Sequence, residues 1–153
     1  MRTARGLFVE RLHRMLWVEE TLARDLLPLV LARAHAIDLQ YCVERHVLET
    51  QEHVLAVRTI LRLLGERQEG VEDPVLVVLR RELGETDLEL ADLLAKGEHL
   101  EIAAYTALRS LANALGEEDI GIRLTEILEQ EQYALELVEK ATAKILAEAV
   151  TAA

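Results

Sequence analysis

The sequence predicts an all-α protein folded as an antiparallel four-helix bundle. Hydrophobic residues make up 51% of the 153 residues, but only 3% are aromatic, so aliphatic side chains dominate the core. The chain has only 7 Gly and 2 Pro, and several of them separate segments whose apolar residues recur at helical spacing. This pattern is typical of long helices with short connections.

The first half of the chain predicts two long helices. The first covers roughly residues 7–34, and Pro28 should kink it because proline lacks a backbone N–H. A short connection at residues 35–38 leads to the second helix, which runs to about Leu64. Gly65 stands where a glycine commonly ends a helix.

The second half predicts a short helix and two long ones. Residues 75–83 form a small apolar segment inside a Gly- and Pro-containing connection. The third long helix opens at the capping-box pattern Thr86 to Glu89 and ends near Gly116, and the fourth fills most of residues 118–149. The long crossover between the second and third helices is the connectivity of ferritin-like folds.

The composition disfavours several classes of binding partner and predicts the cellular compartment. A net charge of −11 disfavours nucleic acid and anionic membrane surfaces as partners, and it is compatible with handling cations. Cys42 is the only cysteine, so a reducing compartment is expected. No apolar run approaches the length of a membrane span, and the N-terminus lacks the apolar core of a signal peptide. We expect one soluble, cytoplasmic domain over residues 1–153.

Acidic residues interrupt the inward face of every long helix. Each predicted seam is apolar except near its middle, where glutamate replaces leucine. Buried carboxylates are costly unless they are paired, protonated or bound to a cation. The predicted inward residues at mid-bundle are Glu20, Glu49, His53, Glu98, Glu101 and Glu131.

These side chains suit a pair of metal ions. Residues three or four apart share a helix face, so Glu49 with His53, and Glu98 with Glu101, can each present two ligands. Carboxylates with one imidazole favour iron or manganese, and two divalent ions would offset most of the negative charge. We therefore predict two iron ions, with manganese as the alternative.

Other assignments remain open. An error of one position in a seam would turn Glu19, Glu52 or Glu129 inward instead. We interpret His13 and His46 as structural, and Tyr105 as core packing.

Several segments resemble a known family. Residues 98–105, EHLEIAAY, resemble the E-H-Y-E-I-A-x-Y motif of small bacterial stress proteins called YciF-like, a branch of the ferritin-like superfamily. Similar segments surround Glu20 before Pro28, Leu48 to His53, and Leu124 to Glu131. The resemblance implies a di-iron bundle, often dimeric, with a role in stress responses.

The sequence departs from the usual ferritin pattern at the fourth helix. Ferritins carry Glu-x-x-His on both the second and fourth helices, but Ala134 and Leu135 follow Glu131 here. Glu101 is expected to compensate, as a second acid does in rubrerythrin-like sites.

Three functions are compatible with this sequence. The first is ferroxidase or redox chemistry on O₂ or H₂O₂, with another protein as electron donor. The second is iron storage, which requires a cage. The third is a non-enzymatic interaction bundle with a structural or vestigial metal site. We also expect a homodimer, because apolar residues off the seams exceed what one bundle needs: Leu22, Leu26, Leu29, Val43, Val47, Val54 and Leu61.

Overall fold

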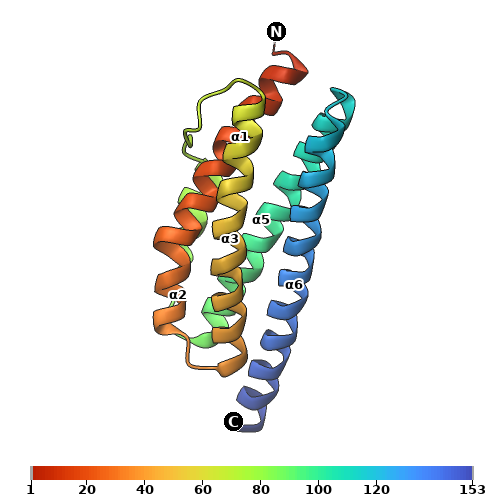
Figure 1. Ribbon diagram of the computed structural model, residues 1–153. Helices are drawn as coiled ribbons and strands as arrows, with labels where there is room; N and C mark the ends of the chain where they lie inside the picture. The colour runs from red at the N-terminus through yellow and green to blue at the C-terminus, as the bar shows by residue number, and fades with distance from the viewer. Residues whose placement is uncertain (1, 153) are drawn as a thin grey trace.

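The computed structural model describes residues 2–152, and within that range every regular element is helical (Figure 1). The elements are α1 (Ala4–Thr21), the π-helical turn η1 (Leu22–Leu26), α2 (Leu27–Arg33), α3 (Ile37–Leu63), α4 (Pro74–Leu79), the 3₁₀ turn η2 (Arg80–Glu82), α5 (Asp87–Ala114) and α6 (Glu118–Ala152).

Four long helical legs form the bundle. The chain descends through α1 and α2, returns through α3, and crosses the length of the bundle before α5, which runs parallel to α3 (Figure 1). The last helix, α6, then runs back antiparallel to α5. The most extensive packing is between α5 and α6, followed by α1 and α3. Further contacts join α3 to α6 and α1 to α5, so each long helix packs against two others. The predicted fold is confirmed.

Glycines end α3 and α5 as the sequence predicted. Gly65 and Gly116 have φ angles of 75° and 73°, a left-handed conformation that glycine adopts without steric cost. In both cases the next N–H reaches back into the last helical turn, from Glu66 to the Leu61 carbonyl and from Glu117 to the Ala112 carbonyl. These are Schellman motifs.

Pro28 changes the winding of the first leg. The Leu27 N–H donates to the Leu22 carbonyl, one residue farther back than in an α-helix. An α-helical turn would press the Pro28 ring against the carbonyl four residues earlier. The wider π turn relieves that clash, and α2 begins with Pro28 in its first turn.

The crossover is fixed to α1 before it forms α4. The Val71 N–H donates to the His13 carbonyl at 2.9 Å, and the His13 Nδ1 lies 2.6 Å from the Glu69 carbonyl oxygen. His13 therefore has the structural role we predicted. The extra helix α4 is shorter than the predicted residues 75–83, because the chain continues as a 3₁₀ turn from Arg80.

The apolar surplus that led us to expect a homodimer lies largely inside the single bundle. Leu22, Leu26, Val43 and Leu61 are buried in the core, and Val47 and Val54 are partly buried. Only Leu29 of that set is well exposed. Most of the residues that we selected from the sequence as surplus apolar surface are therefore buried, and that selection is wrong.

No helix among the described residues is both long enough and apolar enough to cross a membrane.

Candidate metal centre

Six buried polar side chains meet at the middle of the bundle, and we call them the acid–histidine cluster. They come from α1, α3, α5 and α6, and none is more than 5% exposed. The members are Glu19, His46, His53, Glu98, Glu101 and Glu131.

The cluster consists of two overlapping groups of four residues. In each group, one ligand atom per residue lies within 4.8 Å of the others. The first group contains Glu19 and His53, and the second contains His46 and Glu98. Glu101 and Glu131 belong to both groups. Each group therefore offers one imidazole and three carboxylates, and two of the carboxylates, those of Glu101 and Glu131, are common to both groups.

The donor set matches that of ferritin-like di-metal sites, which use four glutamates and two histidines. The difference is where the histidines originate. Ferritin-like sites take them from two helices, whereas His46 and His53 both lie on α3. Seven residues are about two helical turns, so both rings point to the same side of α3.

Histidine nitrogens lie close to the carboxylates. The His46 Nε2 is 3.1 Å from a Glu98 oxygen and 3.5 Å from a Glu101 oxygen. The His53 Nδ1 is 2.8 Å from a Glu131 oxygen and 3.4 Å from a Glu19 oxygen.

Many buried ligand atoms still lack a hydrogen-bond partner among the described residues. These are one oxygen each of Glu19, Glu98, Glu101 and Glu131, and the Nδ1 atom of His46. Buried polar atoms are rarely left unsatisfied without a reason such as an ion. The cluster therefore fits a metal.

Protons balance the charge of the metal-free cluster. Burial raises the pKa values of Glu98 and Glu101 well above their usual range, and the nearby carboxylates of Glu131 and Glu19 raise them further. Burial opposes the shift of Glu131, but His53 and His46 lower its pKa to about 2. Burial likewise opposes the shift of His53, but Glu131 and Glu19 raise its pKa to about 11.

A second layer of contacts orients the cluster. The His53 Nε2 lies 2.7 Å from the Gln130 amide oxygen. Because that oxygen can only accept, Nε2 donates its N–H to Gln130, and Nδ1 is the nitrogen that faces the site and would bind a metal once its own proton is lost. The Tyr105 hydroxyl donates to Glu19 at 2.6 Å, and its ring packs edge-on against His53. Burial, followed by the charge of Glu19, raises the pKa of Tyr105 well above its usual range.

Four of the predicted site residues lie in the cluster, namely His53, Glu98, Glu101 and Glu131. Glu20 does not. Its carboxylate accepts from the Arg58 guanidinium at 2.7 Å on the flank of the bundle, so the predicted inward position of Glu20 is wrong. Glu19, which we had left open as an alternative, takes that position.

The error on the first helix has a simple cause. The buried seam is Phe8, Leu12, Met15, Glu19, Leu22 and Leu26, which lies one residue earlier than the seam we predicted. That seam is apolar at every position except Glu19, but Leu16 and Leu27 of the predicted seam are buried too, so both adjacent seams of this helix are largely apolar.

Glu49 lies beside the cluster but outside both groups. The Arg45 Nε donates to one of its oxygens at 2.6 Å, and the Arg45 guanidinium lies over the Tyr133 ring at 4.5 Å. The other Glu49 oxygen is buried without a hydrogen-bond partner among the described residues. Glu52 and Glu129, which we had left open as inward alternatives, are exposed.

His46, which we interpreted as structural from the sequence, belongs to the second ligand group. It lies on the predicted α3 seam one heptad before His53, and that spacing was the available signal. In the structure it supplies the second imidazole of the cluster, which the usual ferritin pattern takes from the fourth helix.

The chain is similar to known proteins in family and fold. A family model described as "Domain of unknown function (DUF892)" matches residues 3–151. The chain belongs to this family. No curated protein matches the sequence.

Solved structures share the fold. YcfI from Rhodopseudomonas palustris is 26% identical, with a TM-score of 0.85 over 90% of this chain and 94% of its own. The Escherichia coli stress protein YciF is 22% identical, with a TM-score of 0.86 over 94% of this chain and 96% of its own. A protein from Bacillus anthracis described as ferritin-like and diiron-carboxylate is 17% identical, with a TM-score of 0.79 over 93% and 99%. The predicted YciF-like resemblance and the ferritin-like fold are confirmed.

Proposed function

We propose that this protein binds two iron ions in the acid–histidine cluster and acts as a ferroxidase or as a redox protein on O₂ or H₂O₂. The observation that carries the proposal is the sharing of Glu101 and Glu131 by two ligand groups. A single metal needs no second histidine and no second set of acids. Manganese is the alternative metal.

The ligand types favour iron or manganese over zinc. Structural zinc sites use mainly cysteine and histidine, and the one cysteine, Cys42, is not in the cluster. The four glutamates of the cluster, with Glu49 beside it, provide five negative charges, and two divalent ions would offset four of them. Such a pair would supply the electrons that reduce O₂ or H₂O₂.

The surrounding residues would hold the ligands in place. Gln130 fixes the tautomer of His53, and Tyr105 fixes one oxygen of Glu19. The burial of all six ligands excludes bulk water from the centre. We assign Glu49 as a further ligand that exchanges its contact with Arg45 for the metal, since its second oxygen is already buried without a partner among the described residues.

The electron donor would be another protein, because the sequence offers no second cofactor motif. We place the protein in the cytoplasm and in a stress response. The single buried cysteine suits a reducing compartment, and the similar Escherichia coli protein is described as a stress protein.

The deciding experiment adds ferrous iron to the metal-free protein under air. We expect about two iron ions per chain by elemental analysis, and oxidation of ferrous iron accompanied by consumption of O₂ or H₂O₂. The Glu129→Ala variant is the matched control on α6 and should behave as the wild type, since Glu129 is exposed. Metal binding without any oxidation would favour the alternative, a non-enzymatic bundle with a structural site. Absence of metal after reconstitution would refute the di-metal proposal.

A further inference from the structure

A small cavity lies between the first leg of the bundle, the short helix α4 and α5, and we call it the α4 cavity. Its volume is about 20 Å³, which is room for one molecule about the size of water or dioxygen. Nine of the residues that line it are leucine, valine or glycine, and the other three are His46, Glu98 and Glu101. These three belong to the second ligand group of the acid–histidine cluster, so the cavity connects α4 with the proposed metal centre.

The mouth of the α4 cavity lies between α4 and α5. Of the described residues that line the cavity, only Leu79 on α4 and Gly97 on α5 are partly exposed, and the others are buried. A glycine inside a helix is destabilising relative to alanine. Packing does not require one here, because a Cβ at Gly97 would meet no packing neighbour within 4 Å among the described residues. The missing side chain instead leaves the mouth open.

The lining of the α4 cavity suits a small apolar molecule. Between the mouth and the three cluster ligands, the described lining offers no side chain that can form a hydrogen bond. Hydrogen peroxide carries O–H donors, which are costly to bury without partners, and a divalent ion costs far more. Dioxygen is apolar, so its transfer from water into such surroundings is favourable.

We propose that the α4 cavity is the passage by which dioxygen reaches the acid–histidine cluster, and that Gly97 and Leu79 set the width of its mouth. The passage rests on the proposed function, and it selects dioxygen over hydrogen peroxide as the oxidant. It approaches the cluster from the side of the second ligand group, through His46, Glu98 and Glu101.

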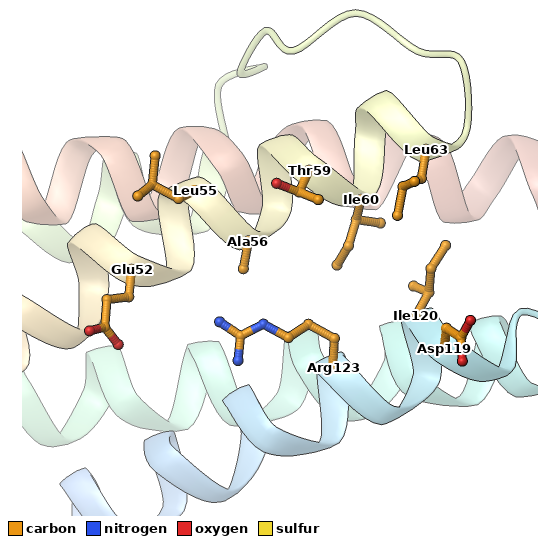
Figure 2. A pocket seen from close by; sticks show the side chains of 9 residues that line it. All are labelled: Glu52, Leu55, Ala56, Thr59, Ile60, Leu63, Asp119, Ile120 and Arg123. Atoms are coloured by element: carbon orange, nitrogen blue, oxygen red, sulfur yellow. The ribbon is translucent and has the colours of Figure 1, made fainter.

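Two other openings differ from the α4 cavity in what they reach or in their charge. A groove between α3 and the start of α6 has a volume of about 440 Å³, but none of the nine lining side chains that Figure 2 shows belongs to the cluster. A narrow cleft between α3, α5 and α6 does reach His46 and Glu98, and Arg45 and Glu49 line it. Charged side chains suit an ion better than an apolar molecule. Metal loading should therefore not depend on the mouth at Gly97.

The first test uses the metal-free protein, with dissolved dioxygen as the probe. Dioxygen has unpaired electrons, so it accelerates the nuclear relaxation of methyl groups that it approaches. Under dioxygen pressure, NMR should show a larger acceleration for the methyl groups of Leu76 and Leu93, which line the cavity, than for those of Leu124 and Leu128. The second pair is as deeply buried but does not line the cavity. Equal acceleration in both pairs would overturn the proposal.

Substitutions at the mouth test its position. Gly97→Leu should abolish the extra relaxation at Leu76 and Leu93, because the new side chain would fill the open space at the mouth. Gly97→Ala is the matched control, since it also replaces the glycine but adds only a Cβ, and it should keep the extra relaxation. Leu79→Ala widens the mouth from the other side and should increase the relaxation. Unchanged relaxation in both Gly97→Leu and Leu79→Ala, with circular dichroism showing folded proteins, would refute this mouth.

The iron-loaded protein separates the passage from the proposed function. Gly97→Leu should bind as much iron as the wild type, because metal ions would enter elsewhere. Its oxidation by dioxygen should be about tenfold slower, which corresponds to an added barrier of about 1.4 kcal/mol, and its oxidation by hydrogen peroxide should be unchanged. Oxidation by dioxygen at the wild-type rate, or equal slowing with both oxidants, would refute a passage for dioxygen. Absence of iron in the wild type would instead refute the proposed function, and the two failures are distinguishable because the relaxation test needs no metal.

Discussion

Substitutions in the acid–histidine cluster should remove different numbers of metal ions, depending on whether the residue belongs to one ligand group or to both. Glu101 belongs to both groups, whereas Glu98 belongs only to the second. Glu101→Gln should therefore impair both metal positions, and Glu98→Gln should impair only one. We expect near zero metal ions per chain for the first variant and about one for the second, against about two for the wild type.

The magnitude follows from the charge that each variant removes. One unit of charge at about 4 Å from another contributes about 4 kcal/mol at an effective dielectric constant of 20, and the ion is divalent. A lost carboxylate should thus cost at least about 4 kcal/mol per ion that it contacts, or roughly a thousandfold in affinity. For Glu101→Gln this loss applies to both ions.

Glutamine is the suitable replacement because it keeps the shape of the side chain. Both glutamates are almost fully buried, and their raised pKa values mean that the metal-free protein holds them largely neutral. A neutral amide should therefore leave the metal-free fold intact, as thermal unfolding will show.

The assay is elemental analysis after reconstitution and desalting, combined with calorimetric titration. If both variants lose the same number of ions, the sharing of Glu101 by two sites is refuted. Full retention of metal by Glu101→Gln would refute the site itself.

Three further predictions concern contacts around the site and the stability of the fold. Gln130→Leu should weaken metal binding by roughly 10- to 100-fold in a metal titration, because the orientation and tautomer of His53 are no longer fixed. Gln130→Glu keeps an acceptor oxygen and should retain metal binding. Gly70→Ala should destabilise the fold by about 1–3 kcal/mol in urea unfolding, since the added Cβ would lie 2.9 Å from the Trp17 backbone. Gly97→Ala is the control: its Cβ meets nothing within 4 Å, so it should stabilise the fold by up to about 1 kcal/mol. In the metal-free protein the raised pKa values of the two α5 glutamates and of His53 give stability that is present at low pH and is lost as pH rises. The free energy of unfolding should fall from about pH 5 to pH 8, and a rise over that range would contradict the proton-sharing description.

The sequence alone determined the local structure of this protein. Helix ends are set by interactions within a few residues, such as the capping box at Thr86 and the left-handed glycines Gly65 and Gly116. The long crossover then left few ways to arrange four amphipathic helices. The inward glutamates of α5 and α6 could also be predicted from the sequence. Neighbouring apolar residues on each helix fix which side is buried, and these glutamates lie on that side.

Only the tertiary structure decided which residues of α1 and α3 face the site. An apolar helix face is wide enough to contain two adjacent seams, so Glu19 and Glu20 were both reasonable in sequence, and packing against α3 and α5 selected Glu19. The role of His46 depends on where Glu98 and Glu101 of α5 lie, about fifty residues later in the chain. The free apolar surface was likewise decided by packing, since neighbouring helices cover Val43 and Leu61 of α3 but leave Leu48 and Leu55 exposed to solvent.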